Sequence, residues 1–152
     1  MNIKYLKLAI NESKKSALNG EIPIGAVIVK NDQILAIAHN TKEKEKCCIF
    51  HAEINAIIEA CEKNNNWRLD ECDMYVSFEP CPMCASAIRQ SRIRNVYCAL
   101  SNSNSKNTQI IDKIFNELDI NPKVLFYNDL LPIEMQNIMK KFFENKRKNS
   151  NL

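Results

Sequence analysis

The sequence has no apolar run that approaches the roughly 20 residues a helix needs to cross a membrane. Its first segment, in which Lys4 and Lys7 interrupt the apolar positions, lacks the continuous apolar core of a secretion signal. Seven cysteines are an odd number and, spread as they are, make a poor disulfide framework. Together these absences predict a soluble protein of a reducing, cytoplasmic compartment.

Glycine is also scarce, with 2 residues among 152, while asparagine and lysine are abundant. This bias is compositional and carries little functional information. The length and the hydrophobic content of 45% are sufficient for a real core. Because the chain shows no internal repeat and no linker-like stretch, we expect residues 1–152 to form one domain.

The strongest chemical signal comes from His51 and Glu53 in one short motif and from Cys81 and Cys84 in a second motif further along. A catalytic zinc ion keeps three protein ligands and leaves its fourth position to water, whose pKa falls to about 7. His51, Cys81 and Cys84 are three ligands of the right kinds. Glu53, two residues beyond the histidine, is predicted to move protons at that water instead of binding the metal. The pattern predicts a hydrolytic deaminase.

The Cys-x-x-Cys spacing brings two thiolates to one ion when it opens a helix. Pro80 and Pro82 suit such a start, because a missing N–H costs nothing there. The positive end of the helix also lowers thiolate pKa values. Taken alone, however, this spacing fits half of a structural zinc site or a redox pair equally well.

Two alternatives to a catalytic zinc site remain. A closed structural site that adds Cys47 or Cys48 is conceivable, but it would leave Glu53 without a role. A thioredoxin-like redox pair would make the presence of His51 and Glu53 a coincidence. Both alternatives predict that the protein has no hydrolytic activity.

The order of hydrophobic periods predicts an α/β fold. We expect helices over residues 3 to about 19, 51–63, 82–90, 110–118 and from about 134 onward, and strands over residues 26–30, 33–38, 74–78, 96–100 and 124–127. Asn31-Asp32 is a hairpin turn, the charged run 42–46 a solvated loop, and 101–107 a polar loop. The strand–helix–strand order of residues 74–100 implies parallel pairing. Both halves of the metal site then fall at helix N-termini beside strand ends, where open α/β sheets bind ligands.

Several segments spread over nearly the whole chain carry a family resemblance. They are Ile22 to Val29, His39-Asn40, His51 to Ile54, Glu79 to Ala85, Ser91-Arg92-Ile93, and Phe142-Phe143 before a basic end. With these motifs the chain resembles the bacterial tRNA-specific adenosine deaminases of the cytidine deaminase-like superfamily. The zinc motif is specific for the superfamily. Ser91-Arg92-Ile93 and the double phenylalanine favour the tRNA branch over the related guanine and cytosine deaminases.

The resemblance implies a three-layer α/β/α fold of the cytidine deaminase type, with a mixed central sheet of about five strands and a zinc site at helix N-termini. It also implies hydrolysis of adenosine to inosine at the wobble position of tRNA. One Zn²⁺ per subunit would be held by His51, Cys81 and Cys84, with Glu53 as the proton shuttle. The implied partners are the tRNA anticodon stem-loop and a second copy of the chain in a homodimer.

The resemblance further implies substrate contacts. Asn40 would hydrogen-bond a purine edge, although an asparagine that caps a turn has the same sequence signature. Pro23, Ile24 and Ala52 are expected near the base, although Pro23 and Ile24 also suit an ordinary strand entry. Asn102 stands where the family commonly has an aspartate that meets the nucleotide sugar, so a charge is lost while hydrogen bonding is kept. His39 is expected to be packed or exposed and not to be a ligand.

The C-terminal segment is basic. Lys140, Lys141, Lys146, Arg147 and Lys148 stand against one acid, Glu144, in a chain of formal net charge +3. Such an excess suits phosphate contact, although a solvated helix end that complements the helix dipole has the same composition. A second cluster, Arg89, Arg92 and Arg94, allows the same two interpretations.

Two other functions are compatible with the zinc motif. A free nucleobase deaminase acting on guanine or cytosine would use the same zinc centre and would need no basic RNA surface. A non-catalytic zinc-binding subunit of an RNA-binding assembly would bind metal and tRNA without releasing ammonia. The intact Glu53 argues against this last function.

Overall fold

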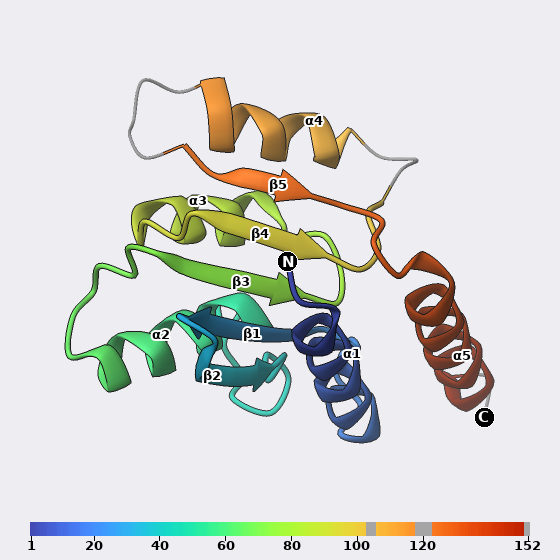
Figure 1. The fold of residues 1–152 in the computed structure, drawn as a ribbon. Helices are drawn as coiled ribbons and strands as arrows, with labels where there is room; N and C mark the ends of the chain where they lie inside the picture. Colours follow the sequence, from blue (N-terminus) through green and yellow to red (C-terminus); the bar gives the residue numbers. More distant parts are fainter. Residues whose placement is uncertain (103–105, 118–122, 151–152) are drawn as a thin grey trace.

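The computed structural model describes residues 1–102, 106–117 and 123–150. Within these ranges one mixed sheet has five strands in the order β2-β1-β3-β4-β5 (Figure 1). The strands are β1 (Gly25–Lys30), β2 (Gln33–His39), β3 (Cys72–Val76), β4 (Asn95–Cys98) and β5 (Leu125–Tyr127). The helices are α1 (Ile3–Leu18), α2 (Ala52–Asn64), α3 (Pro82–Gln90), α4 (Asn107–Asp112), which continues into a π-helical turn η1 (Lys113–Glu117), and α5 (Pro132–Ser150).

Strand pairing matches the expectation of a mixed sheet. β1 pairs antiparallel with both β2 and β3, while β3–β4 and β4–β5 are parallel. The turn between β1 and β2 is made by Asn31 and Asp32, whose φ angles are 48° and 59°. Two successive positive φ angles are what a two-residue hairpin requires. The predicted hairpin is therefore confirmed.

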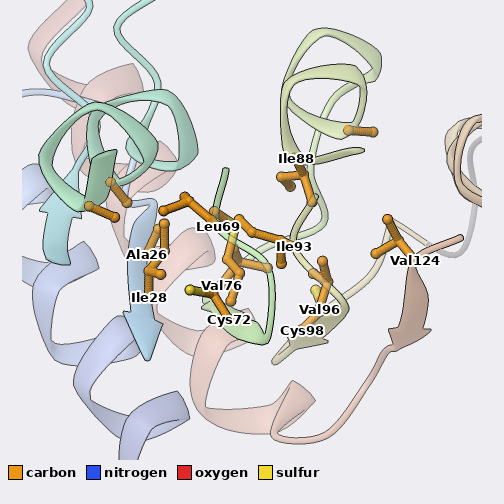
Figure 2. Packing of buried hydrophobic residues seen from close by; sticks show 14 of the residues in the cluster. Ala26, Ile28, Leu69, Cys72, Val76, Ile88, Ile93, Val96, Cys98 and Val124 are labelled. Atoms are coloured by element: carbon orange, nitrogen blue, oxygen red, sulfur yellow. The ribbon is translucent and has the colours of Figure 1, made fainter. Parts of the chain in front are cut away.

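The sheet is the middle of three layers, because side chains of a strand alternate between its two faces. Ala26 and Ile28 of β1 belong to one core with buried residues of α2, α3 and α4–η1, part of which Figure 2 shows. Val27 and Val29 belong to the other core, with α1 and α5. The predicted three-layer α/β/α fold with a mixed sheet of five strands is confirmed.

The two glycines occupy places that other residues fill poorly. Gly20 follows α1 with φ +76°, a left-handed conformation that suits the end of a helix. Gly25 begins β1 where this strand meets α1, and a Cβ atom there would lie 2.2 Å from the carbonyl oxygen of Ala9. The close approach of α1 to the sheet therefore depends on Gly25.

Some boundaries differ from the predicted ones. β3 begins and ends two residues before the expected 74–78, because the parallel register pairs Asp73 with Asn95 and Val76 with Cys98. Both strands then end together. The helix expected over 110–118 begins at Asn107; its predicted last residue, 118, lies outside the described residues, as does part of the loop 101–107. None of the helices in the described ranges is long and apolar enough to cross a membrane.

Candidate active site

His51 and Cys81 occupy equivalent places, since they are the N-cap residues of α2 and α3. Among the described residues, neither side chain makes a capping hydrogen bond with its own helix. The two side chains instead approach each other, with Cys81 Sγ 3.7 Å from His51 Nδ1. Cys84, in the first turn of α3, places its Sγ 3.6 Å from the same nitrogen. Two helix N-termini thus bring together the three side chains that the sequence singled out.

The three side chains could hold one metal ion. Their ligand atoms lie within 4.8 Å of one another, with Cys84 buried and His51 and Cys81 partly buried. One imidazole nitrogen and two sulfurs form a donor set that zinc accepts. Within the described ranges, Cys47 and Cys48 belong to no such group. The structure therefore does not assemble the closed site that would include one of them.

Glu53 stands in the first turn of α2 and is 2% exposed. Its Oε2 atom is buried and has no hydrogen-bond partner among the described residues. Burial raises the pKa of the Glu53 carboxyl to about 7. A buried carboxylate oxygen without a partner lowers stability, and such groups concentrate at functional sites. Together with the donor set, this oxygen indicates that the residues fit a zinc centre that activates water.

The three ligand side chains shift one another's pKa values. A hydrogen bond from the Cys84 thiol, and then the one with His51, lower the pKa of Cys81 to about 4. The hydrogen bond with Cys81 in turn raises the pKa of His51, and donation to Cys81 together with burial raises the pKa of Cys84. The lowered pKa favours the thiolate form of Cys81, the form that binds metal, while the Cys84 thiol would release its proton on binding.

The end of β2 is bonded to α2, the helix that begins after His51. Asn55 stands one turn after His51, and its Nδ2 donates to the carbonyl of His39 at 2.9 Å and to Thr41 Oγ1 at 3.0 Å. Asn40, which lies between His39 and Thr41 in the chain, is 4% exposed, and its Nδ2 donates to Glu21 Oε2 at 3.1 Å. The amide of Asn40 is thus held by a buried carboxylate.

Sequence reasoning missed Glu21 and Asn55. The run 42–46 has partly or fully exposed residues, as predicted, but Glu21 anchors its backbone through the amides of Glu43 and Lys44. An acid directly before the matching segment that begins at Ile22 was the available signal for Glu21. No comparable signal marked Asn55.

The other predicted substrate contacts differ in how exposed they are. Pro23 is buried and Ile24 half-buried in the segment that leads into β1, and Ala52 is fully buried between the metal-site histidine and Glu53. Asn102 is exposed and follows Ser101, whose backbone amide and hydroxyl donate to Asp129 at 2.8 and 2.6 Å.

The second basic cluster has structural partners. Arg89 is 3% exposed and donates to the carbonyl of Ile114. Arg92 and Arg94 each form an ion pair at 2.8 Å, the first with Asp70 and the second with Asp73. His39 likewise pairs with Glu12 at 2.7 Å, as expected for a histidine that is not a metal ligand.

A mixed sheet with two helix N-termini that present histidine, two cysteines and a buried glutamate is the architecture of the zinc-dependent nucleobase deaminases. Comparison with known families agrees. The sequence-family model of the MafB19-like deaminases matches residues 2–147, and the chain belongs to this deaminase family.

Two named relatives show which deaminases this chain is similar to. The chain is 38% identical to the tRNA-specific adenosine deaminase of Bacillus subtilis (strain 168) over 144 residues, which are 95% of this chain and 89% of that protein. It is 36% identical to the one of Aquifex aeolicus (strain VF5), over 95% of each chain. The predicted resemblance to bacterial tRNA-specific adenosine deaminases is confirmed.

Two solved deaminase structures are similar to this chain. A structure from a study of A-to-I editing by tRNA:A34 deaminases at the wobble position has 31% identity and a TM-score of 0.83, and the match covers 90% of this chain and 99% of that chain. A guanine deaminase from Bacillus subtilis has 28% identity and a TM-score of 0.66, over 95% of each chain.

Proposed function

We propose that this chain hydrolyses adenosine to inosine at the wobble position of a tRNA, with one zinc ion per subunit held by His51, Cys81 and Cys84. The observation that carries the proposal is the buried, unpartnered Oε2 atom of Glu53 beside a three-donor group. The choice of tRNA is supported by the names of the relatives at 38% and 36% identity and by the tRNA:A34 deaminase structure.

A zinc ion at this site would supply Lewis-acid activation of water near neutral pH. Glu53 moves the protons. It takes one from the attacking water and delivers it to N1 of adenine, and it then passes the second to the exocyclic nitrogen, which leaves as ammonia. The water oxygen bonds to C6 first, which makes this carbon tetrahedral, and the C6–N6 bond then breaks. Burial raises the pKa of Glu53, so this carboxyl takes up a proton more readily than an exposed glutamate does.

The substrate contacts are part of the proposal. Asn40 hydrogen-bonds the purine edge, while Pro23, Ile24 and Ala52 line the base pocket. Asn102 meets the nucleotide sugar with a neutral amide in place of a charge. Support comes from Asn55, whose bonds to His39 and Thr41 bring the end of β2 to the helix that begins after His51.

The tRNA anticodon stem-loop meets the basic end of α5. Lys140, Lys141, Arg147 and Lys148 are exposed on this helix. A groove of about 500 Å³ between α1 and α5 also has lysines in its lining, Lys14 among them. Clustered cations on one helix suit a phosphate backbone.

A second copy of the chain completes the site. Large apolar side chains on the two helices of the metal site and on the loop before α2 are 37–46% exposed, namely Ile49, Ile58 and Met83. Met83 lies between the two cysteine ligands in the sequence. The exposure of these three apolar side chains supports a second surface that covers them.

The test is inosine formation in an anticodon stem-loop with adenosine at the wobble position, using zinc-loaded protein. Conversion that is lost in Glu53→Ala supports the proposal. Ammonia release from free guanine without inosine formation would instead favour a free-base deaminase, for which the 28% identity to a guanine deaminase is the supporting observation.

A further inference from the structure

Glu21 is a buried acid outside the metal group. It lies between α1 and β1 and is 1% exposed. Its carboxylate accepts three hydrogen bonds from one loop: Oε2 accepts from Asn40 Nδ2 at 3.1 Å and from the amide of Glu43 at 3.2 Å, and Oε1 accepts from the amide of Lys44 at 2.8 Å. All three donors are neutral, so the carboxylate binds the loop by hydrogen bonds and not as an ion pair.

The loop that Glu21 holds connects two parts of the site. It starts at Asn40, the proposed base-contacting residue, and ends at His51. Its base is closed where the amide of Thr41 donates to the carbonyl of Phe50 at 3.1 Å. Asn55 ties the first residues of this loop to α2, while Glu21 ties them to the segment before β1.

The chemistry of Glu21 restricts the amide of Asn40. A carboxylate only accepts hydrogen bonds, so Asn40 must turn its NH₂ group and not its carbonyl oxygen toward Glu21. The backbone of Asn40 is fixed as well, because its N–H donates to the carbonyl of Ile24 at 3.1 Å and its carbonyl accepts from Ser16 Oγ at 3.3 Å. An amide flip would exchange the donor and the acceptor of this side chain, and the carboxylate of Glu21 opposes it.

We propose that Glu21 is a positioning residue for the deamination. It sets the direction in which the Asn40 amide faces and holds the loop of residues 40–44 in place, so that the purine meets one fixed pattern of donor and acceptor. This role rests on the proposed function, because it acts through the base contact of Asn40.

A double-mutant cycle tests whether Glu21 acts through Asn40. The variants are Glu21→Gln, Asn40→Ala and the double variant, each assayed for kcat and KM on the anticodon stem-loop. The new glutamine presents its NH₂ group either to the amide of Lys44 or to Asn40 and Glu43, and in the second orientation Asn40 can flip. We expect Glu21→Gln to lower kcat/KM about tenfold to a hundredfold, the effect of a small misplacement of the substrate. The double variant should be no worse than Asn40→Ala alone, whereas losses that multiply would overturn the proposal.

Glu12→Gln is the matched control. Glu12 is also a buried acid, 7% exposed, and it pairs with His39, the neighbour of Asn40, at 2.7 Å. Since Glu12 does not bond the loop, this variant should keep kcat/KM within about twofold of the wild type, as for an independent site. A loss of kcat/KM equal to that of Glu21→Gln would show that removal of any buried acid in this region impairs activity, and it would overturn the role of Glu21.

Hydrogen exchange separates this proposal from the proposed function. In Glu21→Gln at least one of the amides of Glu43 and Lys44 faces a donor instead of an acceptor and should exchange faster than the loss of global stability alone explains. If the wild type forms no inosine, the proposed function fails, while the exchange experiment still tests the hold on the loop. Unchanged exchange at both amides would overturn the positioning role.

Discussion

The Sγ atom of Cys84 lies 3.6 Å from Nδ1 of His51, although 33 residues separate them in the chain. The contact exists because α2 and α3 pack on the same face of the sheet, where Ala56 and Ile88 belong to one buried core. The metal site is therefore a consequence of how two helices start on a common sheet. A change in either first turn should act on the metal before it acts on the fold.

Cys84→Ala should lose both zinc and inosine formation. Three ligands leave one position for water, and with two ligands the affinity for zinc falls steeply. Metal content and activity are measured on the purified variant. The matched control is Cys48→Ala, which removes an exposed thiol and should keep both. Loss of zinc in the control would instead support a closed structural site in which Cys48 is a ligand.

Glu53→Ala should keep zinc bound and lower kcat by about a hundredfold to ten-thousandfold, the usual contribution of a general acid–base group. The reason is that the carboxylate lies beside the ligand atoms without belonging to the group that could hold the ion. Zinc content and single-turnover inosine formation are measured together. Zinc loss in this variant would make Glu53 a ligand instead of a shuttle.

The sequence predicted those features that residues of one short segment determine, and it missed contacts between residues far apart in the chain. The helix at 82–90 was predicted to the residue, because proline starts it and its apolar positions recur at helical spacing. The metal ligands followed from short motifs. The bond between Asn40 and Glu21 joins residues 19 apart with no periodic pattern between them, so only the folded chain reveals it. The ends of β3 are set by pairing with β4, which is equally invisible in a single segment.

Gly25→Ala should destabilise the protein more than Gly20→Ala. At Gly25 an added Cβ would meet backbone atoms of α1, 2.2 Å from the Ala9 oxygen and 2.7 Å from the Ser13 nitrogen. Such overpacking costs up to about 3 kcal/mol of unfolding free energy. At Gly20 the space is open and only the left-handed φ opposes alanine, at about 1 kcal/mol. Denaturant unfolding of both variants compares them, and equal losses would contradict the close approach of α1 to β1.

Glu12 should make stability depend on acid pH. Burial alone would raise its pKa, but hydrogen bonds from Lys15 and His39 outweigh this effect and hold the pKa below 4.5. A lowered folded-state pKa gives a contribution that is present above 4.5 and is lost as the pH falls through the folded value. Glu12→Gln should therefore lower the melting temperature at neutral pH, and the difference from the wild type should shrink in acid. A constant difference at every pH would contradict the pairing.

Replacing Arg147 and Lys148 by glutamine should weaken tRNA binding and flatten its dependence on salt. Each phosphate contact contributes a slope of about 0.7–0.9 in log K against log salt, so two lost contacts reduce the slope by about 1.5. The loss of affinity is then larger at low salt than at high salt. Binding of the anticodon stem-loop is measured across a salt series.

The control for the C-terminal charges is the double replacement of Lys4 and Lys7 by glutamine. These lysines are exposed on α1, and the change in net charge is the same. If α5 contacts phosphates, the control keeps the slope of the wild type. Equal effects of both pairs would mean that only the overall charge attracts RNA, because a general field acts through net charge and not through place. The basic end of α5 would then be a solvated helix end, and recognition of the stem-loop would rest on the surface around Asn40.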